Sequence, residues 1–348
     1  MGLLKSIAAT LYGAGVGFRN WLYDTKILRS EHFDIPIVCV GNLAVGGTGK
    51  TPAVEFLVRT LGDQYKIAVL SRGYGRRTKG YIEVSVNDSF LRVGDEPKQI
   101  KRKFPDTVVV VCEKRTEGVR RIREEHPEVT LIVMDDGFQH RSLAPTVSIL
   151  LSDYSLPPFQ NKMLPAGTLR DSPSQLYRAE FLFITKTPKT MSPIDRNIAQ
   201  KELKPKPYQS IFFTDVRQSS PKPIFSDVAP AVLPLGSKVV AMAGIANPDK
   251  FFDSLKGQYE VIEKLSYGDH HVYKVKEIRQ LKELMESLGK DVYILTTEKD
   301  GVKLTSRKQI PAELQRRLFV MPIELNFRDN NAPLFVGKLK QELQNKKL

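Results

Sequence analysis

The stretch Val38-Cys-Val-Gly-Asn-Leu-Ala-Val-Gly-Gly-Thr-Gly-Lys-Thr51 decides the fold of this 348-residue chain. An apolar run leads into glycines and then into a helical pattern, which is the strand-loop-helix context of a phosphate-binding loop. Glycines let backbone N–H groups face phosphate oxygens, Lys50 reaches the β- and γ-phosphates, and Thr51 can bind Mg²⁺. The motif starts with alanine where glycine is usual. The residues expected to bind the nucleotide are Ala44, Val45, Gly46, Gly47, Thr48, Gly49, Lys50 and Thr51.

Apolar strand-like runs alternate with helical patterns on both sides of this loop. Continuous Val/Ile/Leu strands separated by helices predict a P-loop NTPase-type parallel sheet with helices on both faces. Prolines then crowd one stretch, and the alternation resumes in what we expect to be a second, smaller α/β domain. The expected parts are an N-terminal amphipathic helix (1–30), a P-loop domain (31–213) with a hairpin lid near 76–92, a proline-rich junction (188–237), the smaller α/β domain (214–330) and a basic C-terminal helix (331–348).

Two acidic pairs lie outside the loop. Asp135 and Asp136 end the apolar run that starts at Leu131, which suits a Walker B element that places a carboxylate beside Mg²⁺. The alternative is a strand that simply ends in a turn. Asp95 and Glu96 follow a glycine and precede a proline. Adjacent carboxylates are usually solvated, so the local sequence alone does not assign this second pair to catalysis.

The composition narrows the class of partner. With 53 Lys and Arg against 39 Asp and Glu, the net charge is +14, which favours anionic partners. The two cysteines, Cys39 and Cys112, lie in apolar runs and indicate core positions in a reducing compartment. Apolar residues recur at helical spacing from Leu4 to Tyr12. Such a stripe either packs on the domain or docks at a membrane surface.

At this point the motifs identify a resemblance. The chain resembles the tetraacyldisaccharide 4′-kinases, the lipid A kinases of Gram-negative bacteria, over nearly its whole length. The eight motifs that carry the resemblance, in order, are Val40-Gly-Asn-Leu-Ala-Val-Gly-Gly-Thr-Gly-Lys-Thr-Pro52, Leu70-Ser-Arg-Gly-Tyr-Gly-Arg76, Gly94-Asp-Glu-Pro97, Asp135-Asp-Gly-Phe-Gln-His140, Leu164-Pro-Ala-Gly-Thr-Leu-Arg170, Ala243-Gly-Ile-Ala-Asn-Pro248, Asp269-His270 and Thr296-Thr-Glu-Lys-Asp300. Together they are far more specific than a single phosphate-binding loop.

The resemblance implies transfer of the γ-phosphate of ATP to the 4′-hydroxyl of an acylated glucosamine disaccharide 1-phosphate, giving lipid IVA in lipid A biosynthesis. It implies Mg²⁺ and ATP as cofactors. It also implies a peripheral position on the cytoplasmic face of the inner membrane, with the anionic membrane surface as a partner. We expect neither nucleic acid nor an obligate protein partner.

The resemblance also assigns roles to residues. It implies that Asp95 is the general base and works with His270, although His271 follows directly and is the alternative. Lys50 is expected to act in catalysis. The expected metal ligands are Thr51, Glu96, Asp135 and Asp136, and the candidates for phosphate or substrate contact are Arg72, Arg115, Gln139, His140 and Arg170.

Two other classes remain as alternatives. A P-loop GTPase or ATPase that acts as a nucleotide-dependent chaperone or adaptor would also need the loop, but the Asn-Lys-x-Asp pattern that selects guanine is not present in the sequence. A nucleic-acid-dependent ATPase would suit the positive charge. Its basic residues would be interleaved with stacking aromatic residues, whereas those of this chain are scattered.

Overall fold

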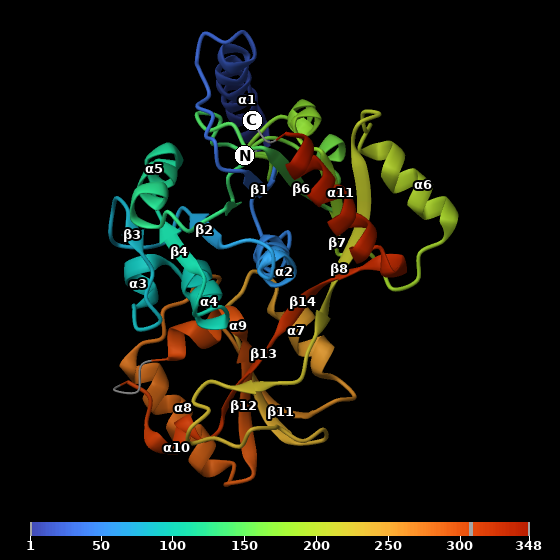
Figure 1. The fold of residues 1–348 in the computed structure, drawn as a ribbon. Coiled ribbons are helices and arrows are strands. Elements are labelled where there is room, and N and C mark those ends of the chain that lie inside the picture. Colours follow the sequence, from blue (N-terminus) through green and yellow to red (C-terminus); the bar gives the residue numbers. More distant parts are fainter. Residues whose placement is uncertain (1, 306–308, 347–348) are drawn as a thin grey trace.

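A computed structural model describes residues 2–305 and 309–346 and shows two α/β domains (Figure 1). Within the described residues, nine strands form the larger sheet, in the order β14-β8-β7-β6-β1-β5-β2-β4-β3. The strands from β8 to β4 run parallel, and the edge strands β3 and β14 pair antiparallel to their neighbours. The bounds are β1 (Ile37–Asn42), β2 (Ile67–Ser71), β3 (Ile82–Glu83), β4 (Val108–Val111), β5 (Leu131–Asp135), β6 (Val147–Asp153), β7 (Phe181–Thr185), β8 (Ser210–Gln218) and β14 (Ile323–Phe327).

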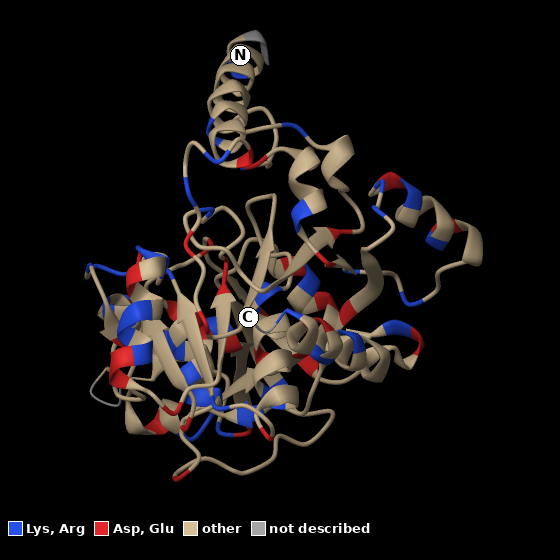
Figure 2. Ribbon diagram, turned by 45° about the horizontal axis from the view of Figure 1, so that its top comes forward, with Lys and Arg blue, Asp and Glu red and all other residues tan. Residues whose placement is uncertain are grey.

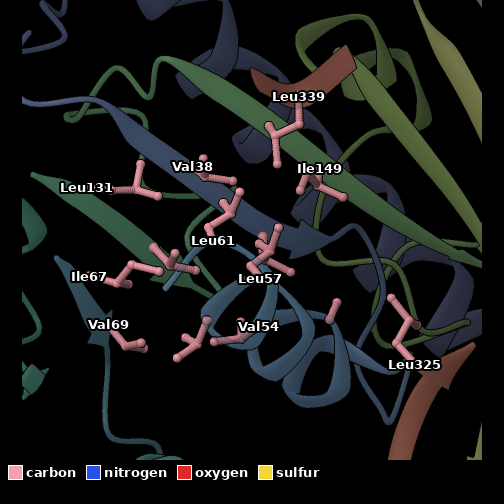
Figure 3. Close-up of a cluster of buried hydrophobic side chains, with 14 of the residues drawn as sticks. Val38, Val54, Leu57, Leu61, Ile67, Val69, Leu131, Ile149, Leu325 and Leu339 are labelled. Atoms are coloured by element: carbon pink, nitrogen blue, oxygen red, sulfur yellow. The ribbon is translucent and has the colours of Figure 1, made fainter. Parts of the chain in front are cut away.

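Helices cover both faces of this sheet, and its inner strands are buried along their whole length. On one face, Leu57 and Leu61 pack against Val38 and Ile149 (Figure 3). This confirms the predicted fold class. The helices of this face are α2 (Lys50–Leu61), α4 (Asp95–Lys103) and α11 (Ala332–Asn345), and those of the opposite face are α5 (Arg115–Glu125), η2 (Pro173–Arg178) and α6 (Pro193–Glu202).

The second sheet lies in a smaller domain, residues 219–322, below the first in Figure 1. Its order is β11-β10-β12-β13-β9, with β9 antiparallel and the other strands parallel. The strands are β9 (Lys222–Pro223), β10 (Lys238–Ala243), β11 (Glu260–Ser266), β12 (Val292–Thr297) and β13 (Leu318–Met321). The helices are α7 (Pro248–Leu255), α8 (Val275–Ser287), α9 (Glu298–Gly301), η3 (Val302–Leu304) and α10 (Ala312–Gln315).

The chain crosses between the domains twice. It leaves the large sheet after β8 and returns where β13 is followed directly by β14, which pairs with β8 from Ile323↔Gln218 to Phe327↔Thr214. The boundary expected at residues 213/214 therefore falls inside β8, and residues 323–330 belong to the large domain. The expected C-terminal helix, α11, packs into the core of the large domain through Phe335 and Leu339.

Residues 76–92 do not form the hairpin that the alternating pattern predicted. The short strand β3 pairs with β4 instead, through Ile82↔Val111 and Glu83↔Val110, and the helix α3 (Phe90–Val93) follows. The prediction was wrong because alternation marks a half-buried strand but does not identify its partner. Here β3 is itself the edge strand, and its partner β4 lies more than twenty residues further along the chain.

The N-terminal helix α1 (Gly2–Asp24) projects from the large domain (Figure 1), and Figure 2 shows few charged residues along it. Leu4 is 74% exposed and Leu11 is 69% exposed, so much of the apolar stripe is uncovered. The C-terminal half is anchored, because the buried side chain of Asn20 donates to Asp171 Oδ1 at 2.8 Å. Among the described helices, none is both long enough and apolar enough to cross a membrane.

Candidate active site

The phosphate-binding loop lies between β1 and α2, at the carboxyl edge of the parallel sheet. Gly46 and Gly49 have φ angles of 107° and 89°, which favour glycine, and Val45 to Gly47 are exposed. The buried Thr48 hydroxyl accepts from Asn42 Nδ2 at 2.7 Å, which fixes the loop to the end of β1. A cavity of about 150 Å³ lies beside the loop and extends to the ends of β6 and β7.

The two acids after β5 have different surroundings. Asp136 pairs with Lys50 at 3.6 Å and receives two hydrogen bonds from Arg170, one of them at 2.9 Å. Burial alone would raise the pKa of Asp136, but the Arg170 hydrogen bonds and the Lys50 charge lower it to about 2. Asp135 is buried and accepts from Ser71 Oγ at 3.1 Å through Oδ2. Burial and the neighbouring Asp136 raise the pKa of Asp135.

The donor set at this edge fits a hard divalent cation. Within the described part of the chain, Asp135 Oδ1 is buried without a hydrogen-bond partner. Burial and the charges of Asp135 and Asp95 raise the pKa of Glu96 to about 7. Buried carboxylates that repel one another are stabilised by a cation with oxygen ligands, and Thr51 lies in the first turn of α2 beside Lys50. Thr51, Glu96 and Asp135 could therefore hold Mg²⁺.

A carboxylate–imidazole pair joins the two domains. Asp95 is the first residue of α4, and its Oδ2 lies 2.9 Å from Nδ1 of His270, in the loop after β11. The Asp95 side chain is 5% exposed and that of His270 34% exposed. The hydrogen bond with Asp95 raises the pKa of His270 above its usual 6.5, although burial opposes the shift. Burial alone would raise the pKa of Asp95, but the His270 hydrogen bond lowers it.

His271 faces elsewhere. Its Nε2 lies 3.0 Å from Glu277 Oε2, and its ring stacks on Tyr267 within the small domain. Of the two neighbouring histidines, His270 is therefore the one that contacts Asp95.

Of the five residues expected to contact substrate, Arg170 binds Asp136, and the other four have different surroundings. Arg72 is exposed directly after β2. Gln139 donates to the Asn42 carbonyl at 2.7 Å, and burial together with the charge of Arg115 lowers the pKa of His140 to about 4. Arg115 is only 1% exposed and donates to backbone carbonyls, one of them that of Asp135, so its guanidinium does not face an open surface.

Sequence reasoning missed four neighbours of the expected residues. Asn42 Oδ1 accepts from Arg170 at 2.5 Å, and Ser71 donates to Asp135 at 3.1 Å. Lys299 Nζ lies 3.0 Å from His270 Nε2, and the Tyr74 ring lies 5.3 Å from the His270 ring. All four lie inside motifs quoted above, so the motifs could have identified them. Of their contacts, only that of Tyr74 with His270 depends on the way the two domains meet.

Comparison with known proteins agrees with this geometry. The sequence matches the family described as "Tetraacyldisaccharide-1-P 4′-kinase" over residues 2–344. It is 39% identical to a tetraacyldisaccharide 4′-kinase of Porphyromonas gingivalis, over 99% of this chain and 98% of the relative. It is 37% identical to one of Bacteroides thetaiotaomicron, over 96% and 92%.

A solved structure also matches. The crystal structure of LpxK from Aquifex aeolicus in complex with ATP superposes with a TM-score of 0.75 at 26% identity, covering 98% of this chain and 97% of that one. The family match spans residues 2–344, and the identities of 39% and 37% extend over 98% and 92% of the two relatives' lengths. The chain thus belongs to the tetraacyldisaccharide 4′-kinase family.

Proposed function

We propose that the chain transfers the γ-phosphate of ATP to the 4′-hydroxyl of a tetraacyldisaccharide 1-phosphate and so forms lipid IVA in lipid A biosynthesis. The observation that carries this proposal is the Asp95–His270 pair, which joins the small domain to the large domain that contains the phosphate-binding loop. A phosphotransferase to an alcohol needs a proton acceptor at the attacking hydroxyl, and a loop that only hydrolyses ATP does not need one from a second domain.

In this mechanism the loop residues 44–51 bind the phosphates of ATP. Backbone N–H groups and the N-terminus of α2 face the phosphate oxygens, and Lys50 neutralises charge on the transferring group. Mg²⁺, held by Thr51, Glu96 and Asp135, would supply further charge stabilisation. Asp136 holds Lys50 in place, because it pairs with that ammonium and with Arg170.

The lone pair of His270 Nε2 takes the proton of the 4′-hydroxyl, and Lys299 Nζ, which lies 3.0 Å from Nε2, must give way to that hydroxyl. The sequence expectation named Asp95 as the base, but this carboxylate is buried and has a lowered pKa, so it accepts a proton poorly. The imidazole is the more exposed partner, and its pKa is raised. Asp95 then holds Nδ1–H and orients the ring, as the carboxylate of a catalytic triad does.

The lipid part of the substrate comes from the membrane. The exposed apolar stripe of α1, with Lys5 and Arg19 on the same helix, supports docking to an anionic bilayer surface. We place the protein peripherally on the cytoplasmic face of the inner membrane, where ATP is available. Arg72, Gln139 and His140 are the proposed contacts of the disaccharide 1-phosphate. Arg115 instead donates to the backbone carbonyl of Asp135, and Arg170 donates to the Asp136 carboxylate. We propose no nucleic-acid ligand and no obligate protein partner.

A labelling experiment tests the function. Gamma-labelled ATP and Mg²⁺ are incubated with the protein and either tetraacyldisaccharide 1-phosphate in detergent micelles or micelles alone. Label should enter the lipid only in the first mixture. Label released as free phosphate at the same rate in both mixtures would favour a nucleotide-dependent chaperone or adaptor and refute the kinase.

A further inference from the structure

The small domain holds helix α4 at both of its ends. At the first residue, Asp95 contacts His270. At the last, Lys103 Nζ lies 3.0 Å from Glu298 Oε1 in the small domain and 2.6 Å from Glu55 Oε2 on α2. Asp95 and Lys103 are separated by about 12 Å along the helix axis. Two well-separated contacts on one helix fix both the position and the tilt of the small domain against it.

The contact at Lys103 is a buried ionic cluster. The side chains of Lys103, Glu298 and Glu55 are 15%, 13% and 2% exposed. Gln99 donates to Glu55 at 2.9 Å, and the backbone N–H of Ile323, at the return crossing, donates to Glu298 at 3.1 Å. Burial would lower the pKa of Lys103, but the two carboxylates raise it, so the ammonium stays charged. Both carboxylates therefore receive hydrogen bonds besides the one from Lys103. Such additional bonds are the condition under which a buried ion pair offsets its desolvation cost.

Glu298 is connected to the catalytic histidine through the chain. It is followed by Lys299, which lies in the same helix α9 and contacts His270 Nε2 at 3.0 Å. A shift of α9 away from Lys103 therefore also shifts the neighbour of His270. The contacts Lys103–Glu298, Lys299–His270 and His270–Asp95 close a ring through α4, and Glu55 connects the ring to the helix of the phosphate-binding loop.

We propose that the Lys103–Glu298 ion pair is a positioning contact that sets the small domain where His270 meets Asp95 and aligns both with the bound nucleotide. This inference rests on the proposed function. Neither residue is among those proposed to contact ATP or the lipid, so both act through the placement of His270. When the pair is lost, the fraction of molecules with an assembled base falls, and the rate of transfer falls in proportion.

Glu298→Gln is the main test, because it removes the charge across the boundary and leaves Lys103 paired with Glu55. We expect kcat to fall about 10-fold with an unchanged KM for ATP. Lys103→Met should lower kcat further, because Glu55 and Glu298 then face each other without a cation between them. Lys103→Arg keeps the charge and should retain most of the rate. The matched control is Glu324→Gln, whose ion pair with Arg59 at 3.2 Å joins α2 to β14 within the large domain. It should leave kcat unchanged.

Two measurements separate positioning from general stability. In a His270→Ala background, Glu298→Gln should cause no further loss, because the pair acts only through this histidine; an undiminished second loss would overturn the inference. Spin labels at the exposed positions of Asp63→Cys and Lys290→Cys report the distance between domains. That distribution should broaden in Glu298→Gln and not in Glu324→Gln. An unchanged distance distribution in Glu298→Gln overturns the inference. A wild-type rate in His270→Ala would refute the proposed base instead, and the distance measurement would then be the test of the Lys103–Glu298 contact.

Discussion

Replacing Asp95 with asparagine tests the proton acceptor most directly. The substitution keeps the size of the side chain and removes the charge that faces His270 Nδ1 at 2.9 Å in a buried setting. A hydrogen bond of this charged kind contributes about 1.5–3 kcal/mol, which corresponds to a loss of about 10- to 150-fold at 1.36 kcal/mol per factor of ten. The amide can also donate to Nδ1, which leaves the proton on Nε2. We therefore expect kcat to fall about 100-fold or more.

The pH dependence of kcat should change in a defined direction. His270 accepts a proton only when it is neutral, so kcat should rise as pH increases through its pKa. Asp95 raises that pKa, so in Asp95→Asn the acid limb should move to lower pH while the plateau falls. The assay is label transfer to the lipid at saturating ATP, with ATP affinity measured separately and expected to change little.

The neighbouring histidine supplies the control. Glu277 contacts His271 at 3.0 Å much as Asp95 contacts His270, so Glu277→Gln should leave the plateau unchanged. A normal plateau in Asp95→Asn, or an acid limb displaced to higher pH, would refute the assignment. So would multiplicative losses in the Asp95→Asn/His270→Ala double mutant, because two groups that act as one unit are non-additive.

Three further outcomes are expected. Lys50→Ala should abolish transfer without changing the circular dichroism spectrum, because its ammonium neutralises the transferring phosphate; normal turnover would contradict the loop assignment. Replacing Leu4 and Leu11 with serine should weaken sedimentation with anionic vesicles and leave the melting temperature unchanged, since both side chains are exposed, and a large loss of stability would indicate packing instead. Phe335→Ala should lower the free energy of unfolding in urea by about 3–5 kcal/mol, because the ring is fully buried among other phenylalanines. A loss below about 1 kcal/mol, as small as that of a surface substitution, would contradict that packing.

Local features were predictable from the sequence. The strand, glycine loop and helix around Lys50 are adjacent in the chain, and the parallel sheet follows from apolar runs of a few residues. Features that depend on distant residues were not predictable in the same way. The partner of β3 was missed, and so was the extension of the large sheet to β14, which pairs with a strand more than a hundred positions earlier.

The sequence predicted which residues form the site better than it predicted their burial and their contacts. The motifs placed Asp95 and His270 together, but only burial distinguishes which of them a substrate can reach. Arg115 was expected to contact phosphate or substrate, yet it is buried and donates to backbone carbonyls, one of them that of Asp135. The Lys103 cluster had no signal in the sequence, since its three charges come from three separate segments.

Because the chain crosses between the domains twice, the two domains become complete at different times during translation. The core of the large domain contains Phe327, Phe335 and Leu343, all made after the small domain. Until they leave the ribosome, β8 has an open edge and the face of the sheet under α11 is bare, and such surfaces aggregate readily. The small domain can fold while the ribosome is still translating, because residues 219–322 are contiguous and contain its whole sheet. The nucleotide-binding half, although its phosphate-binding loop precedes the small domain in the chain, reaches its native state only after α11 has been synthesised.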